Sequence, residues 1–332
     1  MSIRDIRELK STAGRRLRRA QDQKKIALIF VGINILASLL VTVVNYCLGL
    51  EISQTGGLSN FGIRSVLSAL QKVLPIVQMF ALMCLELGYM AAMLRIGRGQ
   101  YTSPQTLKAG MQRFWVMVRA TLLQSLIYKA LGVVCFYLSM QIFLVTPLSG
   151  GFMKTLLPLL SGTSEVDVAA LLADEAVQLQ LLADMAPMYI LLVVLFCVAA
   201  VPVAYQYRMV NYVLLDKPGI GALAAMRESR AMMRCNRFAL FRLDLSFWWY
   251  YGLTMVGMAV CYGDALLAML GVQLPWSDTV SYFLFYGLYL LVVLASCYFL
   301  RNRVEVTYAL AYDSIRPQEK NDGVVLGNIF QM

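Results

Sequence analysis

The sequence predicts an all-α, polytopic membrane helix bundle with six transmembrane helices, and three observations support this fold class. Hydrophobic residues make up 59% of the 332 residues and charged residues only 14%, against about 45–50% and about 25% in soluble domains. The apolar residues form runs of about 20 or more, which is the length that crosses a bilayer. Of the 29 Lys and Arg residues, 25 lie in alternate connecting segments or the termini, as expected when basic loops stay in the cytoplasm.

Residues 1–25 predict a cytoplasmic amphipathic basic helix. They contain nine Lys or Arg and three acidic residues, and the apolar side chains of Leu9, Ala13 and Leu17 share one side at helical spacing. We expect this helix to lie on the membrane surface with that side toward lipid. A signal peptide is the alternative, but the basic region is too long for one, and the following apolar run is long enough to stay as a span.

Six apolar runs predict the spans of a membrane domain that covers residues 26–312. Their approximate limits are 26–50, 66–94, 115–145, 188–215, 240–270 and 280–300. The last run is expected to continue as a helix through Tyr312, and residues 313–332 form a cytoplasmic tail. Six crossings together with the charge asymmetry place both termini on the cytoplasmic side.

The segment 148–187 is predicted to be an extracytoplasmic acidic insertion. Ser164 can cap a surface helix here, with Glu165 and Asp167 in its first turn. From Ser164 onward the insertion has five acidic residues and no Lys or Arg. Their spacing is not that of a calcium-binding loop, so we do not expect a calcium site.

The residue types that carry common enzyme chemistry are missing or wrongly spaced. The chain has no histidine, which excludes histidine bases, Ser-His and Cys-His nucleophile pairs and imidazole metal ligands. The seven cysteines form no CxxC motif, and no Gly-rich phosphate loop, HExxH or GxSxG motif occurs. We therefore expect no enzyme activity, no cofactor and no metal. Basic loops at a membrane surface account for the net charge of +10, so we expect no nucleic-acid partner.

Four arginines form a stripe on the cytoplasmic segment between the fourth and fifth predicted spans. They are Arg227, Arg230, Arg234 and Arg237. On a helix predicted from Ile220 to Asn236 they fall within an arc of about 80°. The simplest interpretation is that the stripe sets the topology and anchors the helix to lipid. The alternative is a dedicated site for anionic headgroups or an acidic protein partner.

Two ionisable residues lie inside predicted spans, where such residues are candidates for function. Glu86 lies in the second span, about 13 Å from its cytoplasmic end at 1.5 Å per residue. Lys129 lies at a comparable or greater depth in the third span. A Glu86–Lys129 pair would offset the cost of burying either charge. Such a pair either joins two helices or belongs to a proton or solute path, which would indicate a small-solute or lipid transporter.

Two similar units precede the third and fifth spans. In the first, Ser103 and Pro104 predict the start of a short helix, and Arg113-Phe114 precedes the span. In the second, Arg237-Phe238 precedes the span. The pattern is compatible with two three-span halves in parallel orientation. The alternative is that an Arg-Phe pair is a common anchor at a membrane interface.

The stretch "YVLLDKPGIGALAAMRESRAMMRCNRFALFRLDLSFWW" resembles the signature of a bacterial, largely Gram-positive, family of integral membrane proteins, domain of unknown function 975. The matching positions are Tyr212, Leu215, Asp216, Pro218, Ala222, Ala225, Ser229, Met233, Leu240, Phe241, Leu243, Leu245 and Ser246. Near the N-terminus "RELKSTAGRRL" is similar to the opening helix of that family, and "VTYALAYDSI", with Tyr308 and Tyr312, to its closing helix. Where the family pattern has a glycine, this chain has Cys235.

The resemblance implies a multi-pass protein of the bacterial inner membrane but supplies no activity. From the residues, the leading hypothesis is a non-enzymatic protein that contacts anionic lipid or a partner protein through its basic cytoplasmic face. The alternative is a transporter that uses Glu86 and Lys129.

Overall fold

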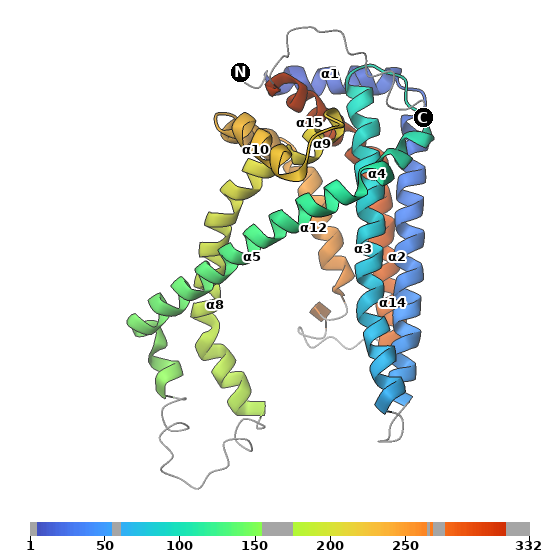
Figure 1. The fold of residues 1–332 in the computed structure, drawn as a ribbon. Helices are drawn as coiled ribbons and strands as arrows, with labels where there is room; N and C mark the ends of the chain where they lie inside the picture. Colours follow the sequence, from blue (N-terminus) through green and yellow to red (C-terminus); the bar gives the residue numbers. More distant parts are fainter. Residues whose placement is uncertain (1–4, 55–60, 155–174, 264–265, 268–275, 317–332) are drawn as a thin grey trace. The chain divides into compact units, whose positions relative to one another are not determined.

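The computed structural model describes residues 5–54, 61–154, 175–263, 266–267 and 276–316, and within these ranges every regular element is a helix (Figure 1). This confirms the all-α fold class. The α-helices are α1 (Ile6–Arg19), α2 (Gln23–Gln54), α3 (Phe61–Gly97), α4 (Ala109–Gln112), α5 (Phe114–Val145), α8 (Glu175–Tyr207), α9 (Val210–Asp216), α10 (Ala222–Met233), α11 (Arg237–Leu245), α12 (Trp248–Cys261), α14 (Asp278–Ser296) and α15 (Asn302–Ile315). Short 3-10 helices are η2 (Pro104–Lys108) and η3 (Pro147–Ser149), and η4 (Cys297–Arg301) is π-helical.

The chain divides into two units, which are described separately. The first unit comprises residues 1–118 and 209–332, and the second comprises residues 119–208. In the second unit α5 and α8 meet near Gly132 of α5, since a Cβ atom added there would be 3.8 Å from the Phe196 ring of α8. Most of the predicted acidic insertion, including Ser164, Glu165 and Asp167, lies outside the described residues.

Five helices are long and apolar enough to cross a membrane, where the sequence predicts six spans; this count refers to the described residues. They are Gln23–Ile52, Gly62–Gly97, Phe114–Val145, Leu182–Asp216 and Thr279–Ile315. Each covers one predicted span, and the last confirms that the final span continues as a helix past Tyr312. The predicted span 240–270 is interrupted instead, because α11 ends at Leu245 and α12 begins at Trp248.

A residue far away in the sequence contacts the break between α11 and α12. The backbone N–H of Phe247 turns back to the carbonyl oxygen of Asp244, at 2.9 Å. The Lys10 ammonium, from α1, donates to the carbonyl oxygen of Ser246 at 2.6 Å and lies 4.1 Å from the centre of the Phe247 ring. Because neither glycine nor proline marks this break, the apolar pattern alone predicts an uninterrupted span.

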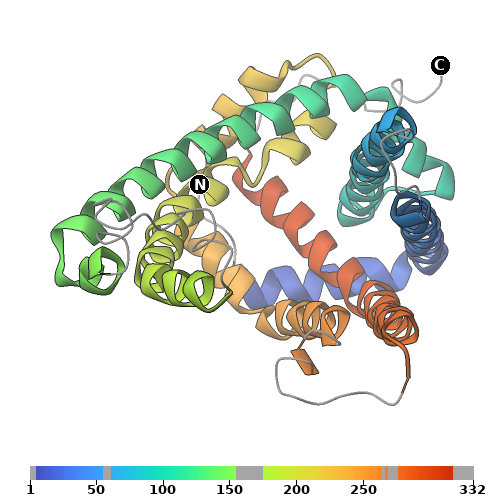
Figure 2. The same cartoon turned by 90° about the horizontal axis from the view of Figure 1, so that it is seen from below.

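The apolar side of α1 packs against protein, which corrects the expectation that it faces lipid. Leu9, Ala13 and Leu17 are buried, and α1 contacts α15 and α3. The helix lies across the ends of the longer helices of the first unit (Figures 1 and 2). In sequence, an apolar helix face looks the same whether protein or lipid covers it.

We call α1, α9, α10 and α15 the cap, because these helices gather at one end of the first unit (Figure 1). A buried cluster lies under the cap, where α1 and α15 meet the adjoining ends of α2 and α3. Its members include Phe30 and Tyr89, whose rings stack with centroids 4.4 Å apart. The hydrophobic core of the first unit therefore lies at the cap end of the long helices.

The long helices α2, α3 and α14 present mostly unburied apolar surface. In the most apolar window of each, at most 28% of the residues are buried. Polar side chains join the helices: Gln78 of α3 donates to Ser38 of α2 at 3.1 Å, and Thr42 of α2 to Tyr286 of α14 at 3.1 Å. Such interhelical hydrogen bonds and exposed apolar faces are typical of membrane helices.

Two glycines let the η2–α4 segment approach α3 backbone to backbone. A Cβ atom at Gly110 would lie 1.8 Å from the carbonyl oxygen of Cys84, and one at Gly88 would lie 2.0 Å from that of Leu107. Pro104 occupies the start of η2 as predicted, although the Ser103 side chain makes no capping hydrogen bond. Only glycine fits these two contacts, which place this segment against α3.

The helix α14 continues into α15 through the π-helical turn η4. A π-helical turn contains an extra residue, so it shifts the faces of the following helix relative to the preceding one. Nine of the fourteen residues of α15 are buried, including Asn302, Thr307, Tyr308 and Tyr312. A helix with this many buried polar groups needs partners for them, and those partners form the site described next.

Candidate functional site

Arg98 is held at the end of α3 by a glycine-dependent turn. Gly99 has a φ of +74°, and its N–H donates to the carbonyl oxygen of Ile96 at 2.9 Å, while that of Gln100 donates to Arg95 at 2.9 Å. These two bonds form a Schellman motif, in which glycine takes the left-handed position. The turn ends α3 and leaves the Arg98 side chain free to reach across to other helices.

Asp216 is the last residue of α9, and the chain leaves the helix directly after it. Pro218 cannot continue the helix, and a turn follows in which the N–H of Ile220 donates to the carbonyl oxygen of Lys217 at 3.2 Å. Only 7% of the Asp216 side chain is exposed. A carboxylate is unfavourable at a helix C-terminus, so this buried one depends on cationic partners.

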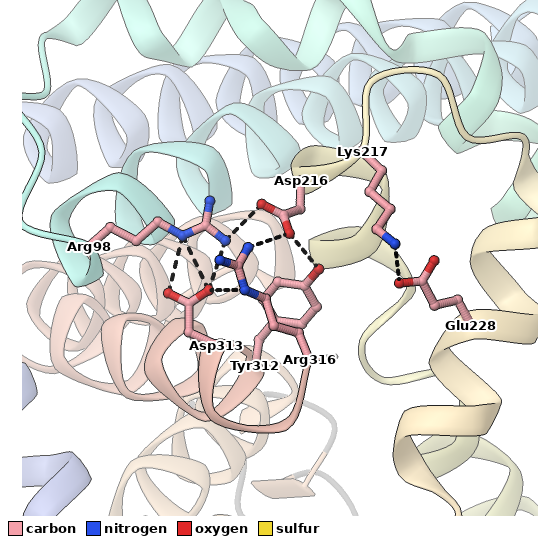
Figure 3. A network of polar contacts seen from close by, with 7 residues as sticks. All are labelled: Arg98, Asp216, Lys217, Glu228, Tyr312, Asp313 and Arg316. Atoms are coloured by element: carbon pink, nitrogen blue, oxygen red, sulfur yellow. Dashed lines mark hydrogen bonds and ion pairs between the residues drawn. The ribbon is translucent and has the colours of Figure 1, made fainter. Parts of the chain in front are cut away.

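Two arginines and a tyrosine supply those partners (Figure 3). One oxygen of Asp216 lies 2.7 Å from Arg98 Nη2, and the other lies 2.8 Å from Arg316 Nη1 and accepts a hydrogen bond from the Tyr312 hydroxyl at 3.0 Å. Arg98 also makes a bidentate contact with Asp313, with bonds of 2.7 and 3.1 Å. We call these five residues, Arg98, Asp216, Tyr312, Asp313 and Arg316, the cap network.

The cap network is electrostatically compensated. Burial alone would lower the pKa of Arg98, but its hydrogen bond to Asp313 and the charges of Asp313 and Asp216 raise that pKa above its ordinary value. The two carboxylates face two guanidinium groups, so each buried charge has a partner. The network joins the ends of α3, α9 and α15. Its paired charges hold these three helix ends together.

A second charged cluster surrounds Arg301 in the π-helical turn. Arg301 forms an ion pair with Glu86 of α3, and its Nε lies 3.9 Å from the carboxylate of Glu305. Its guanidinium also lies over the rings of Phe30 and Tyr89, at 4.8 and 5.2 Å from their centroids. Two carboxylates and two aromatic faces thus compensate this buried cation.

Tyr212 links the two clusters. Its ring stacks on that of Tyr312, with centroids 5.5 Å apart, and its hydroxyl donates to Glu305 at 3.3 Å. A third polar contact on α15 joins the Tyr308 hydroxyl to Asp244 of α11. The helix α15 therefore contributes to every one of these contacts, on several of its faces.

The predicted arginine stripe is divided between two helices. Arg227 and Arg230 lie on α10, which ends at Met233, Arg234 lies in the following turn, and Arg237 begins α11. The predicted continuous helix through Asn236 was therefore wrong by about one turn. Cys235 stands in this turn without requiring glycine, because no residue other than glycine has a positive φ in the described part of the chain.

Glu86 and Lys129 belong to different units. Glu86 pairs with Arg301 in the first unit, whereas Lys129 is an exposed residue of α5 in the second unit. The Glu86–Lys129 pair stays a prediction. The sequence analysis did not predict Arg301 as the partner of Glu86, because Arg301 directly follows an apolar run and counts as a cytoplasmic charge.

The cap network was also missed. Asp216 and Tyr312 stood out only as positions of the family resemblance, and Arg98 only as one more cytoplasmic cation. Arg98 and Asp313 are 215 positions apart, and no local spacing signals such a contact. Within the described ranges no group of three or more His, Cys, Asp or Glu could hold a metal ion.

The family described as "Protein of unknown function (DUF975)" matches residues 1–319. The chain belongs to this family. A comparison with curated proteins finds no match, and a comparison with solved structures finds none either. In this DUF975 chain six of the thirteen signature positions are packing positions, since Tyr212, Ala225, Ser229, Met233, Leu240 and Leu243 are buried.

Proposed function

We propose that this chain is a non-enzymatic, multi-pass protein of the bacterial inner membrane that contacts anionic lipid or a partner protein through a basic cytoplasmic face. Its proposed topology has six spans, with both termini in the cytoplasm. The observation that carries the proposal is a set of exposed and uncompensated cations at the cap end of the first unit.

Those cations are Arg227, Arg230 and Arg234. All three are exposed, and none forms an ion pair with a carboxylate of the described residues. The cap network shows the contrast, because its arginines are matched one for one. Exposed, unmatched arginines at the end of a bundle of apolar helices fit the surface potential of anionic lipid, where each contributes about 1 kcal/mol.

The topology is tested with reporters that are active on only one side of the membrane. Fusions after Met332 and inside the loop near Ser164 should report the cytoplasm and the opposite side, respectively. The reason is that 25 of the 29 Lys and Arg residues lie in segments that six crossings put on one side. Finding both reporters on the same side would remove the span proposed for residues 240–270.

The lipid contact is tested by changing Arg227, Arg230, Arg234 and Arg237 together to Gln. We expect the topology to survive, and we expect the purified protein to retain less anionic lipid, with less dependence on salt concentration. The matched control changes the same four residues to Lys, which keeps the charge. Equal lipid content in the Gln and Lys variants at low and high salt would leave the stripe a topological marker only.

A small-solute or lipid transporter is the second candidate, and the Glu86–Arg301 ion pair favours it. A partly buried ion pair beside a π-helical turn, inside a helix of membrane length, is a feature of functional sites in membrane proteins. The discriminating experiment is a gradient-driven flux measurement in proteoliposomes that compares the unaltered chain with the variants Glu86→Gln and Lys129→Met. Flux that is lost in these variants would support transport over a purely contacting role.

A further inference from the structure

A basic cavity lies apart from the arginine stripe and the cap network. It has a volume of about 510 Å³, and residues of α1, the first turn of α2, η4 and the first turn of α15 line it. The lining includes five cations, Lys10, Arg15, Arg18, Lys24 and Arg303, and no Asp or Glu. No lining cation forms an ion pair with a carboxylate in the part of the chain that the structure describes.

The polar groups of the cavity are arranged to accept an anion. Uncompensated cations repel one another, and a bound anion relieves that repulsion. Burial, and after it the neighbouring charge of Arg303, lowers the pKa of Lys10. Asn302 is only 5% exposed, and its carbonyl oxygen accepts from Tyr89 at 2.5 Å.

The cavity lies where two long apolar helices reach their polar ends. Lys24 is in the first turn of α2, and one turn further on the same face Leu28 is 57% exposed. Tyr298 and Phe299 end the apolar run of α14, and Phe299 is 73% exposed. Aromatic and basic side chains at this level are typical of the membrane interface. Apolar surface thus continues directly from the cationic lining.

We propose that this cavity binds the phosphate-bearing headgroup of an anionic phospholipid, with the acyl chains along the exposed face of α2. This inference rests on the membrane orientation given in the proposed function, but it concerns a site that the arginine stripe does not form. The volume is in the range of pockets that enclose a whole small molecule. The phosphate, the glycerol and part of a headgroup therefore fit, whereas inorganic phosphate alone would fill little of it.

The test uses the full chain in a neutral detergent, titrated with phosphatidylglycerol and measured by native mass spectrometry. We expect one tightly bound phosphatidylglycerol per chain and much weaker binding of phosphatidylcholine. Changing Arg18 and Arg303 together to Gln should raise the Kd for phosphatidylglycerol about tenfold or more, whereas changing both to Lys should alter it less than about threefold.

A steric variant keeps the proposal testable if the charge variant does not fold. Gly14 lines the cavity, and a Cβ atom there would have nothing within 4 Å. Gly14→Leu should therefore fold at least as well as the unaltered chain, because leucine favours a helix more than glycine. Its side chain should take up part of the cavity beside Gly14 and weaken the tight binding without removing any charge.

Three results would overturn the assignment: equal binding of the two lipids, an unchanged Kd in both the Arg18/Arg303 and Gly14 variants, or full displacement of the lipid by millimolar inorganic phosphate. The last result would assign the cavity to a soluble phosphate compound. The Arg227/Arg230 double Gln variant separates this proposal from the proposed function. The Arg227/Arg230 variant should keep the single tightly bound lipid even if it loses salt-dependent lipid contact. The proposed function and the cavity proposal can therefore fail separately.

Discussion

The cap of the first unit buries polar residues together with apolar ones, whereas the long helices leave many apolar residues exposed. In α15, nine of fourteen residues are buried, and they include a buried asparagine, a threonine and two tyrosines. In α2, by contrast, Leu36 and Leu40 are 68% and 60% exposed. In the cap, polar side chains are buried. On the long helices, apolar side chains lie on the exposed surface.

The difference shows which interactions hold each region. The cap is held by protein alone, through ion pairs and buried side chains, so its packing should respond to single substitutions in any solvent. The long helices depend on a surrounding apolar medium, since their exposed faces contact few protein atoms.

Asp216→Asn should have the largest effect. It removes the charge that Arg98 and Arg316 share and leaves both with Asp313 alone, which should cost about 3 kcal/mol of the free energy of unfolding. Thermal unfolding in detergent measures the change. Glu228→Gln is the matched control, because its ion pair with Lys217 is more exposed and should cost about 0.5 kcal/mol or less. A loss for Asp216→Asn as small as that for Glu228→Gln would mean that the cap network does not stabilise the fold.

Gly110→Ala should follow, with a loss of about 2–3 kcal/mol, because its Cβ would overlap the carbonyl oxygen of Cys84 and the backbones must separate. Gly32→Ala in α2 is the control, since nothing lies within 4 Å of its Cβ position. That variant should be neutral or more stable by up to about 1 kcal/mol. A neutral Gly110→Ala would show that α4 does not pack against α3 at this distance.

A double-mutant cycle between Glu86→Gln and Arg301→Met should give a coupling free energy of about 1–2 kcal/mol, because the two side chains form a partly buried ion pair. The same cycle with Lys129→Met in place of Arg301→Met tests the pair that the sequence predicts. Coupling in the first cycle with additivity in the second would assign Glu86 to Arg301. The reverse pattern would assign it to Lys129.

Leu36→Ala should have the smallest effect, about 0.5 kcal/mol or less in detergent, since its side chain packs on little protein. Leu214→Ala in α9 of the cap should cost about 2–4 kcal/mol, because that side chain is almost wholly buried. Melting curves of both variants in one detergent give the comparison directly. A large loss for Leu36→Ala would place protein, rather than lipid or detergent, on that face of α2.

The sequence predicts the long helices well because apolar length is a local property. The predicted span 115–145 corresponds to α5 (Phe114–Val145), and the span 66–94 lies within α3 (Phe61–Gly97). The same reasoning extended the last span through Tyr312, and α15 ends at Ile315. Hydropathy and length decide such elements without knowledge of any neighbour.

The cap and its contacts could not be predicted in this way, because they depend on residues far apart in the chain. The break at Ser246 involves Lys10, and the partner of Glu86 is Arg301, 215 positions away. The sequence also could not predict whether protein or lipid covers the apolar side of α1, since both kinds of burial need the same residues. Charge counts found the basic face but did not separate the matched arginines from the unmatched ones.

The distance between Arg98 and Asp313 along the chain has a consequence for the order of events during translation. Arg98 leaves the ribosome more than 200 residues before Asp313, and α1 leaves earlier still. Until α15 has been made, nothing from that helix covers Leu9 and Leu17, which are buried in the finished structure. The cap of the first unit can therefore close only after nearly the whole chain has been synthesised.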